Sequence, residues 1–301
     1  MSWSAESSED PRDVLSRAIS AELGRAREVL DVGTDPAASV HEARRAIKRA
    51  RALLRLAYPW PTKSPIDDTL RDASRALAVL RDADVLVLTA EDIRESSEPA
   101  EPNIVPVHLL WSLEEERGRQ FAESGSPDGP LRAANELLSS VEVEIGQPKA
   151  PDVKTGHEPR TSSGTELIRV GRAASYASVR ARYDPTVGEG PVDKGSHKLR
   201  KQVKNLRYQI ELLDTGHPKF ARLVRDLHHL TDLLGDRNNL ATLAASADVV
   251  SEIERAALIA HIDGLKQALQ SEEATLSARL FEEEPDSFVA RIEAWVTPPQ
   301  G

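Results

Sequence analysis

Two basic segments with the same internal spacing, one in each half of the chain, constrain the fold more than any other feature of the sequence. The first begins at His41 and the second at His197. Each continues with arginines and lysines three or four positions apart, which places the cations on one stripe of an α-helix. Apolar residues occupy the opposite face of both segments. The repetition predicts two copies of one helical unit, each of which packs by one side and presents cations on the other.

Acidic residues are almost absent from these two stripes. Glu42 is the only acid between residues 41 and 55, and none occurs between residues 197 and 207. Like charges at helical spacing oppose helix formation by a few tenths of a kcal/mol per pair, so such a stripe needs a reason outside the fold. A polyanionic ligand is the natural reason, and the alternative interpretation is that the stripes are ordinary solvated or inter-bundle ionic faces. The candidate binding residues are His41, Arg44, Arg45, Lys48, Arg51 and Arg55 in the first copy, and His197, Arg200, Lys201, Lys204, Arg207 and Tyr208 in the second.

The composition indicates an all-helical protein with an ordinary core. Hydrophobic residues make up 40% of the 301 positions, but aromatic residues only 4%, so the core is built from Leu, Ala, Val and Ile. The chain has no cysteine, which excludes disulfides and thiolate metal sites. No apolar stretch is long enough for a membrane span, and the N-terminus is not a signal sequence, so we expect a cytoplasmic protein. The net charge of −10 is compatible with a basic interior if the acids lie outside.

The order of helical and proline-rich segments predicts a duplicated architecture. We expect one domain over residues 8–298, with a helical bundle at 11–146, a linker at 147–163 and a second bundle at 164–297. Each bundle would contain about four helices. A pseudo-two-fold axis between the bundles would bring the two basic stripes to face each other across a central groove. The predicted fold is therefore all-α, with two tandem four-helix bundles and a basic central groove.

Several residues at matching positions of the two halves are candidates for additional phosphate contacts. These residues are Arg71, Arg75 and Arg81 in the first half, and Arg225 and His229 in the second. Pairing with local acids such as Asp72 and Asp226 is the alternative interpretation for them. We interpret Asp82, Asp84 and Asp236 as turn and cap residues that also orient the arginines.

The motif His-x-x-Arg-x-x-x-Lys-x-x-Arg occurs at residues 41–51 and again at 197–207, and Arg81-Asp-Ala-Asp84 follows the first copy. In these features the chain resembles the CHAD family, the conserved histidine alpha-helical domains, over nearly its whole length. The resemblance implies two similar helical bundles that bind inorganic polyphosphate in a basic central cavity and have no catalytic activity of their own. We expect such binding to recruit the protein to polyphosphate granules.

The chain departs from the family pattern at a few positions. Asn205 stands where a second basic residue is common beside the lysine, and Gly235 replaces the counterpart of Arg81. The second copy would then supply fewer phosphate contacts. Many relatives carry a tunnel triphosphatase domain with a Glu-x-Glu-x-Lys signature. The nearest string here, residues 142–146, lacks the lysine, so we expect the stand-alone form.

The leading hypothesis from the sequence is a non-catalytic protein that binds inorganic polyphosphate, with no metal or cofactor. Two other classes of function remain open. A metal-dependent phosphohydrolase would need clustered carboxylate and imidazole ligands, whereas the stripes are crowded with cations that repel a metal ion. A nucleic-acid-binding protein would be expected to interleave aromatic residues with the basic ones, and these helices do not. Membranes and nucleic acids are therefore not expected partners.

Overall fold

Every regular element in the described part of the chain is helical, which confirms the all-α prediction there. The structure, a computed structural model, describes residues 9–32, 35–58, 64–96, 104–124, 129–143, 164–183, 192–212 and 218–296. The predicted linker at 147–163 lies outside these ranges. The helices are α1 (Pro11–Val32), α2 (Pro36–Ala57), α3 (Asp67–Ala76), α4 (Ala78–Ser96), α5 (Val107–Ser124), α6 (Pro130–Ser139), α7 (Gly164–Arg180), α8 (Val192–Glu211), α9 (Pro218–Ala245), the short 3₁₀ turn η2 (Ala247–Val249), α10 (Glu252–Leu280) and α11 (Pro285–Val296).

Helix α2, which carries the first basic stripe, begins at a well-defined N-terminal cap. The Asp35 carboxylate accepts hydrogen bonds from the backbone N–H groups of Ala37 (2.9 Å) and Ala38 (3.2 Å). Pro36 occupies the first helical position, where its missing N–H costs nothing. The buried face of α2 includes Ala43 and Ile47, so the stripe of cations faces away from this core.

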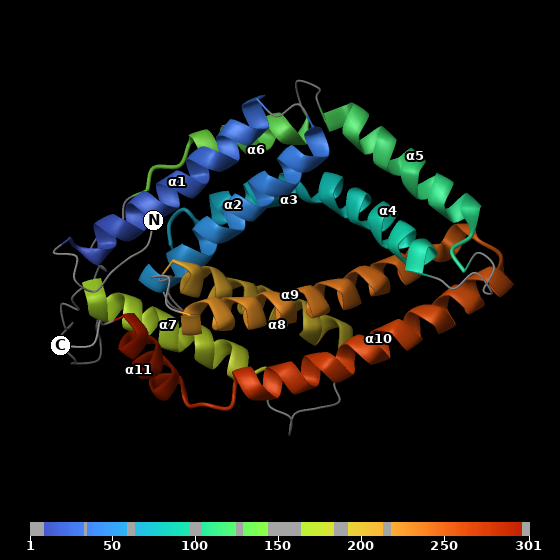
Figure 1. Cartoon of the computed structure of the whole chain (residues 1–301). Coiled ribbons are helices and arrows are strands. Elements are labelled where there is room, and N and C mark those ends of the chain that lie inside the picture. Colours follow the sequence, from blue (N-terminus) through green and yellow to red (C-terminus); the bar gives the residue numbers. More distant parts are fainter. Residues whose placement is uncertain are drawn as a thin grey trace, which may run out of the picture.

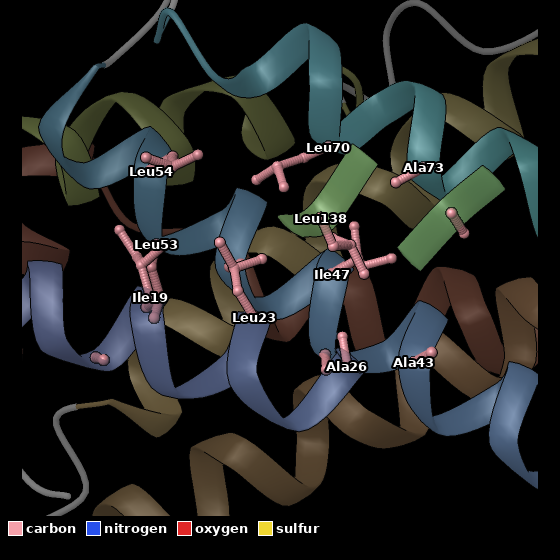
Figure 2. Packing of buried hydrophobic residues seen from close by; sticks show 14 of the residues in the cluster. Ile19, Leu23, Ala26, Ala43, Ile47, Leu53, Leu54, Leu70, Ala73 and Leu138 are labelled. Carbon is pink, nitrogen blue, oxygen red and sulfur yellow. The ribbon is translucent and has the colours of Figure 1, made fainter. Parts of the chain in front are cut away.

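The first of three apolar clusters joins α1, α2, α3 and α6. Figure 2 shows Ile19 and Leu23 of α1 against Ile47 of α2, with Leu70 of α3 and Leu138 of α6 close by. Small residues at several contacts, such as Ala26 and Ala43, are fully buried and let the helices approach closely. This cluster holds α2 by the side opposite to its cations.

The second cluster gives the same support to α8. It joins α7, α8, α9 and α11 with the C-terminal end of α10. Val203 and Leu206 of α8 are fully buried in it, and the Tyr176 ring stacks on Phe288 at a centroid distance of 4.0 Å. Figure 1 shows α8 and α9 side by side below α2 at the centre of the molecule, with α5 and α10 along opposite outer edges.

The third cluster crosses between the two halves of the chain. Helices α4 and α5 of the first half pack against η2 and parts of α9 and α10 in the second. Val87 and Leu109 from the first half, and Leu243 and Leu258 from the second, are all fully buried in this contact. Apolar packing therefore crosses the predicted boundary between two bundles, and the pseudo-two-fold relation stays a prediction.

The interpretation of three aspartates as turn residues is wrong. Asp82 and Asp84 lie within α4, and Asp236 lies in the interior of the unbroken α9. Local Asp and Gly favour turns, but apolar residues continue at helical spacing through this region of α9, with Leu230, Leu234 and Leu240 buried. In the first half the chain does break, at Leu77 between α3 and α4.

No helix in the described ranges has both the length and the apolarity that crossing a lipid bilayer requires.

Candidate functional site

Helices α2 and α8 contact each other directly, which places the two basic stripes side by side. The contact is fixed by Gln209 of α8, a fully buried side chain whose Nε2 donates a hydrogen bond to the Ala52 carbonyl oxygen of α2 at 2.9 Å. A buried amide bound to the neighbouring backbone fixes the register of the two helices, because leaving its donor unpaired would be costly.

Five cations from three helices converge at this contact, and we refer to them as the cationic cluster. Burial first, and then neighbouring cations, lower the pKa of Lys48 to about 7 and that of Lys204 to about 8. The charge of Lys204 is one of those that lower the pKa of Lys48. The charge of Arg81 on α4 lowers the pKa of both lysines. The cationic cluster consists of Arg44, Lys48, Arg81, Arg200 and Lys204.

The cluster is short of counter-ions. None of the described residues forms an ion pair with Lys48 or Lys204. Arg44 Nη1 donates to the Ser74 carbonyl oxygen at 2.5 Å, while its buried Nε has no hydrogen-bond partner. The Nε of Arg200 is also buried without a partner. Cations held together in this way favour a ligand that brings negative charge and hydrogen-bond acceptors.

Two carboxylates at matching positions of the halves border the cluster. Asp82 of α4 lies near Arg44, and Asp236 of α9 lies near Arg200. Burial lowers the pKa of both guanidinium groups, and the nearby carboxylate offsets part of that effect. Asp232, one turn before Asp236, acts in the same direction on Arg200 and also on Lys204.

The two repeated histidines lie at the rim of the cluster. Partial burial is the largest cause that lowers the pKa of His41, followed by the charge of Arg81. Burial also lowers the pKa of His197, with Lys201 as the next cause, while a hydrogen bond with Asn238 acts in the opposite direction. Near neutral pH these rings are therefore mainly neutral, and a neutral imidazole can still donate one hydrogen bond to a phosphate oxygen.

The outer cations of the stripes are paired with acids. Arg51 Nε donates to Asp67 Oδ1 at 2.9 Å, and Arg55 Nη2 donates to Oδ2 of the same carboxylate at 3.2 Å. Asp67 is buried, with 2% of its surface exposed. Although burial raises its pKa, the hydrogen bond and charge of Arg51 and the charge of Arg55 hold that pKa below its usual value. These two arginines are thus ion-paired with one shared carboxylate.

Arg207 and Tyr208 of the second stripe are buried. Arg207 Nε lies 3.2 Å from Glu211 Oε1, and its guanidinium lies 4.6 Å from the centre of the Tyr208 ring. Arg49, which the sequence did not single out, covers the same ring at 5.5 Å. Arg45 lies 3.6 Å from Glu42. The phenol of Tyr208 is thus a packing element between cations.

The additional candidates fall into three groups. Arg71 pairs with Asp68 at 2.8 Å, and the exposed Arg75 pairs with Asp72 at 3.2 Å. Arg81 belongs to the cationic cluster. Arg225 and His229 line a depression of about 500 Å³ on α9, together with Ala221, Val224, His228 and Asp232.

His229 is bound to an acid, since its Nε2 lies 2.6 Å from Glu272 Oε1. Lys201 lies near Arg51 and Arg75. Burial first, and then the charges of these two arginines, lower the pKa of Lys201. The structure therefore brings together the central members of the two stripes and leaves the outer ones to local ion pairs.

Gly235 has a role that the sequence did not show. A Cβ atom added at this position would lie 2.7 Å from Arg200 Nη2, which is closer than van der Waals contact allows. The absence of a side chain at residue 235 thus gives the Arg200 guanidinium its place beside α9. The only signal in the sequence was a glycine in a position where the first half has an arginine.

Two of the comparisons with known proteins found a match for this chain. The sequence matches the CHAD domain family over residues 13–248. A similar solved structure is the crystal structure of the CHAD domain from the plant Ricinus communis, with 18% sequence identity and a TM-score of 0.45. The alignment covers 98% of this chain and 96% of that chain. No curated protein matches the sequence.

Proposed function

Because the chain belongs to the CHAD domain family, we propose that it binds inorganic polyphosphate at the cationic cluster and catalyses no reaction of its own. The single observation that supports this most strongly is the convergence of five cations, two of them lysines without an ion pair among the described residues. Bringing these charges together costs free energy in the empty protein. A polyanion offsets that cost when it binds.

The chemistry of the cluster suits a chain of phosphates. Arg44, Arg81 and Arg200 offer planar guanidinium groups that can donate two parallel hydrogen bonds to phosphate oxygens, and the lysines offer compact charges. Each charge-assisted hydrogen bond contributes about 1.5–3 kcal/mol. Polyphosphate presents only charge and acceptor oxygens, so a cluster of donors is sufficient to recognise it.

A nucleic acid fits this site less well. Single-stranded nucleic acids are usually held by aromatic side chains on which bases stack. Tyr208, an aromatic residue of the second basic helix, is 4% exposed and is covered by Arg207 and Arg49. It offers no free face to a base.

A titration of the purified protein with long-chain polyphosphate at two salt concentrations tests the proposal. We expect tight binding that weakens with salt, because the ligand and protein release counter-ions. The binding should survive a chelator and an excess of RNA or orthophosphate. Absence of binding, or binding that requires a metal ion, would contradict the proposal.

A pair of lysine variants locates the site. The double variant Lys48→Met/Lys204→Met should bind at least about tenfold more weakly and show a flatter salt dependence, since charge-assisted contacts are lost. Lys198→Met is the matched control, because Lys198 is an exposed lysine on the same helix α8. An equal loss in both proteins would show that only the overall charge matters.

We propose further that the protein is cytoplasmic and associates with polyphosphate granules through this binding. A fluorescent fusion should then co-localise with granules, and the double lysine variant should be diffuse. Granule association that persists in the double variant would point to a protein partner.

A further inference from the structure

Arg81 is the member of the cationic cluster that comes from outside the two basic helices. It lies on α4 and its charge acts on groups of both stripes. Those groups are His41, Arg44, Lys48, Arg200 and Lys204. Arg81 is therefore close to both α2 and α8, and a ligand between the stripes would meet it.

An arginine in this position needs an opposing force to stay there. Its side chain is long and flexible, and four cations of the cluster repel it. Arg81 is partly exposed, so without a restraint its guanidinium would turn towards water. A position next to the ligand site would then be only one of many conformations, and ordering it would reduce the affinity.

Asp84 supplies the restraint. It follows Arg81 by one helical turn, and only 9% of its surface is exposed. Its Oδ2 accepts a hydrogen bond from Arg81 Nη1 at 2.5 Å, while Oδ1 lies 3.8 Å from Arg117 Nη1 of α5. The carboxylate thus binds Arg81 directly and also lies within ion-pair distance of an arginine from a second helix.

We propose that Asp84 is a positioning residue that holds the Arg81 guanidinium between the two basic stripes before polyphosphate binds. The inference rests on the proposed function of the cationic cluster. Asp84 does not itself contact the ligand, since a carboxylate repels phosphate. It acts through Arg81, whose second guanidinium edge remains available for a phosphate oxygen.

The second half of the chain uses the equivalent position in a related way. The residues that match Arg81 and Asp84 in the repeat are Gly235 and Asn238. The Asn238 side chain hydrogen-bonds to His197 at the rim of the cluster. In both halves, therefore, the side chain at this position orients a basic group of the site. It is the carboxylate of Asp84 in α4 and the amide of Asn238 in α9.

The direction in which one substitution changes the affinity distinguishes a positioning role from a purely electrostatic role. Asp84→Asn removes a negative charge near a polyanion site, so a purely electrostatic role predicts tighter binding. Positioning predicts the reverse, a loss of about three- to tenfold in affinity, because Arg81 is no longer held. The control is Asp232→Asn, which removes an exposed acid near Arg200 and Lys204 and should leave binding unchanged or tighter.

The salt dependence provides a readout that a general structural defect would not change. Asp84→Asn should flatten the dependence of affinity on salt by the same amount as Arg81→Met, because both remove one phosphate contact. In the Arg81→Met background, Asp84→Asn should cause no further loss. Arg119→Met, which removes an exposed arginine of the same helix α5 that pairs with Glu116, serves as a control for a change on α5 and should retain the affinity.

If Asp84→Asn does not fold, Asp84→Glu keeps the charge but displaces the carboxylate, and it should also weaken binding and flatten the salt dependence. Wild-type affinity and salt dependence in whichever variant folds would overturn the positioning role while the proposed function stands. Failure of the wild-type protein to bind polyphosphate would instead refute the proposed function.

Discussion

The Arg200 guanidinium of α8 lies directly against Gly235 of α9, where a Cβ atom would come within 2.7 Å of Nη2. Gly235 is buried inside an unbroken helix, so its role is to provide space and not a special backbone conformation. The contact couples the packing of α9 to the direction in which one cation of the cluster points.

Gly235→Ala should therefore weaken polyphosphate binding without weakening the fold. Alanine is favoured over glycine in a helix interior by about 1 kcal/mol, which offsets the cost of moving the flexible Arg200 side chain. We expect an affinity loss of about three- to tenfold with an unchanged or higher midpoint of thermal unfolding. Gly264→Ala is the control, because a Cβ atom there would meet no atom within 4 Å. Equal affinities of the two variants would contradict the role of Gly235.

Polyphosphate binding should become weaker as the pH rises through the range of the two cluster lysines. The pKa of Lys48 is about 7 and that of Lys204 about 8 in the empty protein, so both are partly neutral at slightly alkaline pH. The ligand favours their charged forms and must draw protons from the solution. Titration calorimetry at pH 7.5 in two buffers of different ionisation enthalpy measures this uptake. Lys48→Met should reduce it, whereas Lys198→Met should not.

The stability of the empty protein should change with pH in the opposite direction. A lysine whose pKa is lowered on folding binds fewer protons in the folded than in the unfolded state between about pH 7 and 10. The free energy of unfolding therefore rises with pH across this window. It falls as the pH drops through the same window and the lysines become charged. Urea unfolding at pH 6.5, 7.5 and 8.5 checks the trend. A slope that is the same in the double variant Lys48→Met/Lys204→Met would show that other groups cause it.

Asp67→Asn should destabilise the fold but not the binding of the ligand. The substitution leaves Arg51 and Arg55 without their shared carboxylate, which we expect to cost about 2 kcal/mol in the free energy of unfolding. Loss of the Asp67 negative charge makes the region beside the cluster more positive, so affinity should be equal or higher. Urea denaturation and a polyphosphate titration of the same protein measure both effects. Unchanged stability together with weaker binding would show that Asp67 belongs to the ligand site.

The sequence predicted the helical class because that class depends on regular patterns. It also predicted that the two basic stripes face each other across a groove, whereas the structure shows direct contact of the two helices. The spacing of His41, Arg44 and Lys48 requires only helical geometry, and its repetition at His197 indicates an equivalent partner helix. Arg81 was also found, since it follows the first copy of the motif at a recognisable distance.

The ion pairs of the outer cations could not be predicted in this way. Asp67 lies on α3 and reaches Arg51 only after the chain has turned back on itself. The stripe therefore looked unpaired over its whole length, although its outer part forms ion pairs. Pairing between elements depends on tertiary packing, which leaves no periodic mark in the sequence.

The course of α9 shows how packing overrides local preference. Asp236 was interpreted as a turn residue, yet burial of Leu234 and Leu240 on one face keeps the helix continuous. The contact of α4 and α5 with α9 and α10 was likewise not expected, because apolar faces alone do not identify their partners. The groove and the two separate bundles stay predictions.

Because the cluster lies at the α2–α8 contact, the complete site forms only when the two halves of the chain are together. Arg44, Lys48 and Arg81 come from the first half, whereas Arg200 and Lys204 come from the second. A chain divided between residues 143 and 164 would yield two fragments, each with an incomplete set of cations. Recovery of polyphosphate affinity on mixing would then report complementation of the fragments, and the ligand itself would favour their reassembly.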